Sequence, residues 1–126
     1  MEERQGAIDK KGQSGKVYHF KYGWYAYRLL SKQTDVTKMG ELPVDQYVAY
    51  LFLAGLLACK TKNDLPDGFE LDHVYEVLDD LNDADAKEVY KLAEHALGFI
   101  LESVQKMMTN GQATPADQQA LTGTPS

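Results

Sequence analysis

The feature that most constrains the fold is a change of apolar period at Gly23. Residues 16–21 alternate between two faces in the manner of a half-buried edge strand. From Trp24 onward, apolar residues recur every three or four positions, which is typical of one face of a helix. A strand therefore leads directly into a helix. Because a single strand leaves backbone groups unpaired, we expect it to pair with residues 5–8 or with another subunit, and an open edge would accept a foreign strand.

Helical spacing continues through the rest of the chain. It predicts a first helix from residue 24, a second from Pro43 to about Lys60, a short third over residues 74–81 and a long fourth from about residue 84 to Met108. Residues 33–42 carry loop signals. The predicted fold is mainly α, a four-helix single domain with a short N-terminal β-strand or hairpin.

Composition divides the 126 residues into three parts. Residues 1–15 are rich in charge, Gly and Ser, and we expect a flexible N-terminal arm there. The helical domain is expected over residues 16–108. Residues 109–126 contain a single large apolar side chain, Leu121, which predicts a disordered C-terminal tail.

Charge is distributed unevenly along the chain, whose net charge is −6. Residues 1–40 hold eight Lys and Arg against four Asp and Glu, whereas residues 64–88 hold ten acidic residues against Lys87 alone. The asymmetry fits a solvated helical face, and it also allows head-to-tail self-association or attraction of a basic partner. A sequence pI near 4.9 disfavours nucleic-acid binding, because the basic residues are dispersed.

Targeting and membrane signals are weak. The longest uncharged apolar run, residues 47–59, has 13 residues, fewer than the ~20 that a membrane span requires. Residues 1–5 are followed by no apolar leader segment, and the lone Cys59 has no partner for an internal disulfide. We therefore expect a cytoplasmic protein with no membrane contact.

Sequence signatures of catalysis or metal binding are not found. A calcium loop starting at Asp80 would need Gly at its sixth position and Glu at its twelfth, where Asp85 and Lys91 stand. The stretch Gly12–Lys16 lacks Walker A spacing. Cys59 follows apolar residues, as an inert core thiol does. Three histidines are isolated from one another: His19, His73 and His95. We expect no enzyme activity and no cofactor.

Aromatic residues are unusually dense over residues 18–27, more than one small core can bury. We expect the first helix to bury one apolar stripe, formed by Phe20, Trp24, Tyr27 and Leu30. Tyr22, Tyr25 and Arg28 lie off that stripe, and they are the predicted partner-binding residues because Tyr and Arg are favoured at interfaces. The alternative is that the two tyrosines merely cap the core edge.

Residues 16–81 resemble the tail assembly chaperones of long-tailed bacteriophages. The resemblance is one of residue types: a strand leading through Tyr22-Gly23 into a helix with Ala26, Leu29 and Leu30, then the apolar helix 47–56 closing on Ala-Gly-Leu, then the acidic segment 71–79. The long fourth helix is not part of the pattern.

The resemblance implies a non-catalytic protein that binds the tape measure protein, keeps it soluble in the host cytoplasm, recruits the tail tube protein and is absent from the mature virion. Self-association into a homo-oligomer is compatible with the exposed apolar residues. An alternative is a structural phage tail or head-tail joining component retained in the virion. A third, less favoured, is a small helical regulator that binds DNA.

Overall fold

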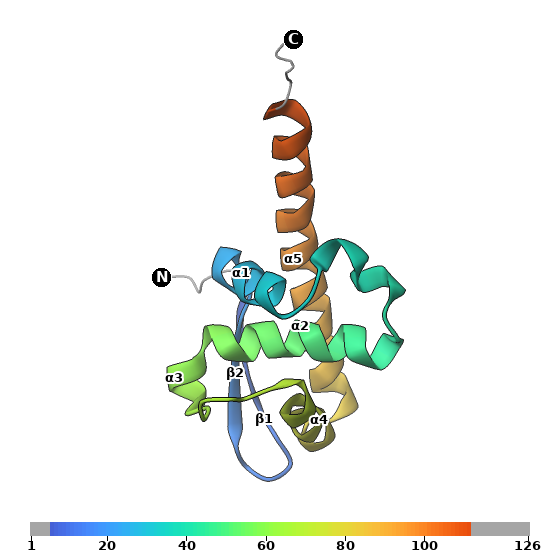
Figure 1. Ribbon diagram of the computed structural model, residues 1–126. Helices are drawn as coiled ribbons and strands as arrows, with labels where there is room; N and C mark the ends of the chain where they lie inside the picture. The colour runs from blue at the N-terminus through green and yellow to red at the C-terminus, as the bar shows by residue number, and fades with distance from the viewer. Residues whose placement is uncertain (1–5, 112–126) are drawn as a thin grey trace.

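The computed structural model describes residues 6–111, and Figure 1 shows their arrangement. The chain is mainly α-helical with a short N-terminal hairpin, as the sequence predicts. The elements in chain order are β1 (Ala7–Lys11), β2 (Val17–Lys21), α1 (Trp24–Gln33), the 3-10 helix η1 (Val36–Glu41), α2 (Val44–Ala58), α3 (Lys60–Asn63), α4 (Leu71–Asp80) and α5 (Asp83–Gly111). The described residues thus form five α-helices, because the chain bends at Cys59 and separates α3 from α2.

The N-terminal hairpin starts earlier than the sequence predicts. β1 pairs antiparallel with β2, with Asp9 opposite His19. The expected flexible arm 1–15 therefore supplies a strand, and the folded region does not begin at residue 16. Gly6 allows this start, because its φ is +88° and the Tyr22 N–H donates to its carbonyl oxygen at 2.7 Å. The expected disordered tail 109–126 is wrong over its first residues, since α5 continues to Gly111. The rest of that prediction falls on residues 112–126, which lie outside the described range.

The outer edge of β2 is closed at its centre by α3. The side chain of Asn63 is buried, accepts a hydrogen bond from the His19 N–H at 2.7 Å and donates one to the His19 carbonyl at 2.8 Å. The same amide donates to the carbonyl of Leu56 at 3.1 Å. Asn63 thus satisfies backbone groups as a neighbouring strand would, and a foreign strand cannot pair with β2 at His19.

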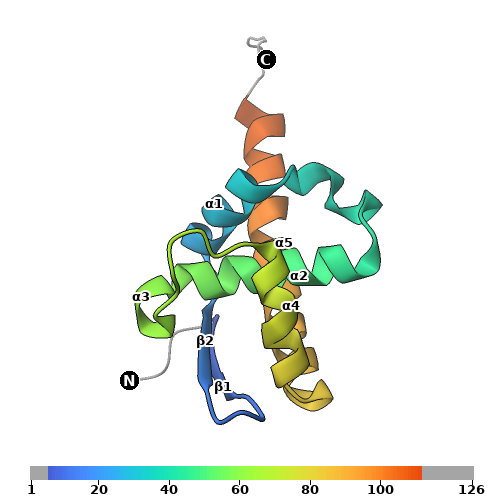
Figure 2. The same cartoon turned by 60° about the horizontal axis from the view of Figure 1, so that its bottom comes forward.

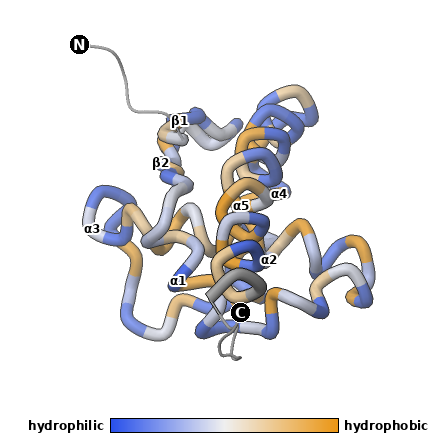
Figure 3. The backbone as a smooth tube through the Cα atoms, turned by 90° about the horizontal axis from the view of Figure 1, so that it is seen from above, coloured by the Kyte–Doolittle hydropathy of each residue, from blue (hydrophilic) through white to orange (hydrophobic). Residues whose placement is uncertain are grey.

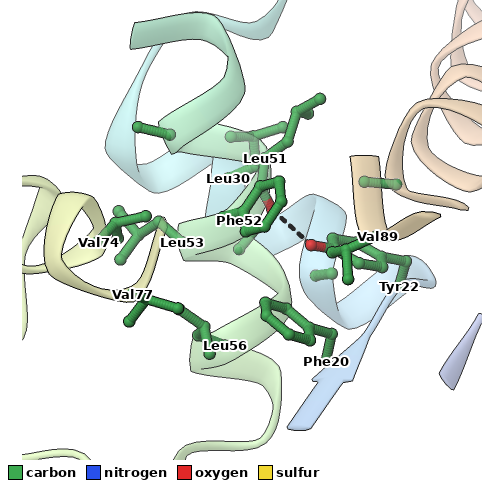
Figure 4. Packing of buried hydrophobic residues seen from close by; sticks show 14 of the residues in the cluster. Phe20, Tyr22, Leu30, Leu51, Phe52, Leu53, Leu56, Val74, Val77 and Val89 are labelled. Atoms are coloured by element: carbon green, nitrogen blue, oxygen red, sulfur yellow. Dashed lines mark hydrogen bonds between the residues drawn. The ribbon is translucent and has the colours of Figure 1, made fainter. Parts of the chain in front are cut away.

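The core forms around α2, which the hairpin, α1, α4 and α5 surround (Figures 1 and 2). Residues 51–56 of α2 are buried on every side, as expected for a helix that is apolar nearly all round. Phe20 of β2 packs edge-on against Phe52, with ring centroids 5.5 Å apart (Figure 4). These contacts join the strand to the central helix.

Tyr22 connects the hairpin and α1 to the middle of α2. Its side chain is 3% exposed, and its hydroxyl donates a hydrogen bond to the Leu51 carbonyl at 3.0 Å (Figure 4). The ring lies against Gly55, where a Cβ atom would overlap the ring and the hydroxyl. Burial raises the pKa of Tyr22 well above its ordinary value. The neutral phenol is therefore an integral part of the core.

Replacing Gly55 by alanine tests this contact. We expect Gly55→Ala to lower the free energy of unfolding by about 1 to 3 kcal/mol, because the added methyl group forces Tyr22 from its position. Gly98→Ala in α5 is the matched control, since nothing lies within 4 Å of a Cβ atom there. That change should raise stability by about 0.5 to 1 kcal/mol through helix propensity. Urea denaturation measures both, and equal effects would contradict the proposed overlap.

Candidate interaction surfaces

The solvent face of α1 carries large aromatic side chains. Trp24 and Tyr25 are 56% and 59% exposed, and Arg28, one turn after Trp24, is also exposed. The Trp24 ring contacts Tyr27 edge-on, with centroids 6.3 Å apart. Trp, Tyr and Arg are the residue types that most often dominate binding energy at interfaces. We call Trp24, Tyr25 and Arg28 the α1 surface.

The structure separates the three predicted partner-binding residues. Tyr25 and Arg28 are exposed together, as predicted, but Tyr22 is buried and cannot contact a partner. The predicted core stripe is right at Phe20 and Leu30, which are buried, and wrong at Trp24, in whose place α1 buries Ala26. Trp24 is thus the surface residue that sequence reasoning missed. The sequence feature that could have indicated this is Gly55. A glycine in an apolar helix leaves room for a large ring, and the structure places the ring of Tyr22 there rather than that of Trp24.

A hollow of about 590 Å³ adjoins the α1 surface, between the outer face of the hairpin and the end of α2 with α3. Tyr25 lines it together with Lys21, Lys60 and Lys62. The Asp9 carboxylate and the His19 Nδ1 lie 2.7 Å apart on the same face. Lys60 is paired with the exposed Asp67 carboxylate at 3.0 Å, so the three lysines face two carboxylates, Asp9 and Asp67. The region keeps a small excess of positive charge, carried by Lys21 and Lys62, and is suited to an acidic group of a partner.

Cys59 also lines this hollow, but its thiol is not activated. Burial raises its pKa, and this effect outweighs the opposing effect of Lys62 and Lys21. Less thiolate is then present at neutral pH, so the thiol is a weak nucleophile. Within residues 6–111, no group of three or more His, Cys, Asp or Glu side chains is placed to hold a metal ion.

The glycine-rich turn 12–16 binds a carboxylate of its own chain. Asp80, at the end of α4, accepts hydrogen bonds from the Ser14 N–H at 2.8 Å, the Ser14 hydroxyl at 2.7 Å and the Tyr18 hydroxyl at 2.8 Å. A Cβ atom at Gly12 would overlap the carboxylate. The turn has the glycine-rich composition of a phosphate-binding loop, but its hydrogen-bond donors bind Asp80 and thereby fix the hairpin to α4.

Substitution of Asp80 should change the acid sensitivity of the fold. Hydrogen bonds from Ser14 and then Tyr18 hold the pKa of Asp80 below its ordinary value of 3.8. Such a carboxylate adds stability that is present above pH 3.8 and is lost as pH falls through its folded pKa. We expect Asp80→Asn to lower the melting temperature at neutral pH and to weaken its fall in acid.

The matched control is Asp79→Asn, since Asp79 is the exposed neighbour of Asp80 and makes none of these bonds. Circular dichroism melts across the acid range would compare the variants. Indistinguishable pH profiles for the two variants would show that the turn does not depend on Asp80. At alkaline pH, burial and Asp80 raise the pKa of Tyr18 to about 12, so its contribution is present below pH 10 and is lost as pH rises to about 12.

An apolar groove of about 490 Å³ lies on another side of the molecule, between α1, η1, the start of α2 and the middle of α5. We call it the apolar groove. Its floor and walls include Leu30, Met39, Leu42, Leu97 and Leu101. The Glu94 carboxylate also lines it and accepts hydrogen bonds from the hydroxyls of Tyr47 and Tyr90. A groove of this composition suits an apolar side chain or an amphipathic helix.

Some of the charge asymmetry is neutralised within the fold. Lys10 of β1 contacts the carboxylates of Asp85 and Glu88 at the start of α5. The Lys10 pKa is raised, chiefly by its hydrogen bond to Glu88. Asp85, together with Asp83, lies in the first turn of α5, where a negative charge interacts favourably with the positive end of the helix dipole.

Comparison with protein-family models, with curated proteins and with solved structures finds no match. None of the helices over residues 6–111 combines the length and the apolar character that a membrane crossing needs. The arguments on function therefore depend on the surfaces of this chain and on the residue pattern of its sequence.

Proposed function

We propose that the protein is a non-catalytic tail assembly chaperone of a long-tailed bacteriophage. In this proposal it binds the tape measure protein in the host cytoplasm, recruits the tail tube protein and does not remain in the mature virion. The residue pattern over 16–81 supports the family, and the exposed Trp24 and Tyr25 beside Arg28 carry the proposal of a binding surface.

The α1 surface fits this role for a physical reason. Exposing a Trp and a Tyr next to each other gives no stability to the monomer, whereas burying them against a partner removes apolar area from water. Arg28 adds a charged donor group at the edge of the same surface. The basic hollow next to Tyr25 would accept acidic side chains that flank an apolar helix of the partner.

Alanine substitutions test this surface. Trp24→Ala, Tyr25→Ala and Arg28→Ala should each weaken binding to the tape measure protein by about 1 to 2 kcal/mol and change the melting temperature little, because all three are exposed. Phe99→Ala provides a matched control, since Phe99 is an equally exposed aromatic on α5. Tyr22→Ala should instead destabilise the fold.

Co-expression with the tape measure protein of the same genome measures binding by pull-down and chaperone function by solubility. We expect soluble complex with the wild-type chain and less with the α1 variants. A tape measure protein that is equally soluble with and without this chain would contradict the proposal. Detection of the chain in purified virions would instead favour a structural component of the particle.

A further inference from the structure

The apolar groove holds a charge that the fold leaves unpaired. Among the described residues that line the groove, Glu94 alone is charged. The hydroxyls of Tyr47 and Tyr90 donate to its Oε2 atom at 3.3 and 2.8 Å, and the carboxylate forms no ion pair within the described residues. The two tyrosines thus hold the carboxylate in place, while Oε1 stays available. A cation that enters the groove beside an apolar group would match this lining.

Gly98 leaves an open position in the same wall of the groove, one turn after Glu94. Nothing lies within 4 Å of a Cβ atom there, so no contact of the monomer requires a glycine, although glycine weakens a helix relative to alanine. Figure 3 looks along α5 from its C-terminal end and shows the connection from α1 through η1 to α2 passing on one side of this helix. The groove lies on that side, with room for a large side chain about 6 Å along the helix from the carboxylate.

The α1 surface carries groups that match both features. Arg28 is exposed and forms no ion pair within the described residues, and Trp24, one turn earlier, is 56% exposed. Four residues separate Trp24 from Arg28, and four separate Glu94 from Gly98, so each pair spans about 6 Å of helix. In an antiparallel arrangement of the two helices, Arg28 meets Glu94 in the register that brings Trp24 to Gly98. The guanidinium is the cation best suited to pair with a carboxylate at an interface.

We propose that the chain self-associates by placing the α1 surface of one copy in the apolar groove of another, with α1 antiparallel to α5 of the second copy. Arg28 of one copy pairs with Glu94 of the other, and Trp24 lies over Gly98 among the leucines of the groove. The two surfaces adjoin within each molecule, because the Trp24 ring contacts Tyr27 and Tyr27 lines the groove. One two-fold contact can therefore seat both α1 helices.

Self-association and binding of a partner then exclude each other, because both use the α1 surface. The paired state removes Trp24 from water until a partner of higher affinity displaces the second copy. This association goes beyond the proposed function and does not rest on it, since it involves this chain alone.

Charge reversal tests the contact on the full chain, with no partner protein present. We expect sedimentation equilibrium to show a wild-type dimer that dissociates in the micromolar range. Arg28→Glu and Glu94→Arg should each raise the dissociation constant by about tenfold or more, because like charges then face each other in an apolar groove. Lys11→Glu is the matched control, since Lys11 is exposed on β1 outside both surfaces, and it should leave the dimer intact.

A mixture of the two charge-reversed variants tests the pairing itself. Every contact between an Arg28→Glu chain and a Glu94→Arg chain again joins opposite charges. The equimolar mixture should therefore form the dimer that neither variant forms alone, while circular dichroism melts confirm that each variant is folded. A wild-type chain that stays monomeric well above the micromolar range, a mixture that stays monomeric, or an equal loss with Lys11→Glu would overturn the proposal.

Filling the groove tests the contact without changing its charge. Gly98→Leu places a side chain where Trp24 of the second copy lies, and it should raise the dissociation constant by about tenfold or more. The monomer should tolerate the change, because the position is open. Ala84→Leu is the matched control, an exposed position of α5 outside the groove. A dimer that forms equally well with Gly98→Leu would place the contact elsewhere and refute the arrangement.

Discussion

The fold depends on the fit of the Tyr22 ring against Gly55. Tyr22 stands between the last residue of β2 and the first of α1, so its position fixes both elements relative to α2. Its hydroxyl must find a partner in the core, and the Leu51 carbonyl provides one. The same fit sets the rotation of α1. Once Tyr22 is inside, Ala26 follows one turn later in the core, and Trp24 and Tyr25 face solvent.

The sequence predicted the elements better than their contacts. The change of period at Gly23, the apolar second helix and the long last helix are all present, because periodicity reflects burial directly. β1 was only partly predicted: residues 5–8 were one of two expected partners for β2, but the strand runs over 7–11, where Asp9, Lys10 and Lys11 give little apolar signal. α3 was missed because it has no apolar period of its own. Its main contact is the side chain of Asn63, which forms hydrogen bonds with the backbone of a distant strand.

The candidate surface was half predictable. Residue type identified Tyr25 and Arg28 as candidates. Because six of the ten residues 18–27 are aromatic, the helix could be rotated in several ways and still bury an equally apolar stripe, so the sequence does not fix its rotation. Choosing between Tyr22 and Trp24 required knowing that Gly55 lies opposite Tyr22, a tertiary contact across 33 residues of sequence. Similarly, the turn around Ser14 has the composition of an anion site, and only the fold reveals that Asp80 is the anion.

The contacts of the hairpin have a consequence for the order of folding. His19 bonds to Asn63, Ser14 to Asp80 and Lys10 to Glu88, across 44, 66 and 78 residues respectively. A two-stranded hairpin is only marginally stable alone, and contacts so remote must overcome the entropy of closing long loops. We therefore expect the N-terminal segment, although synthesised first, to become ordered after the helices have assembled. On that order its strands would stay unpaired by the helices until the core has formed, and the helical core would be the surface on which the hairpin closes.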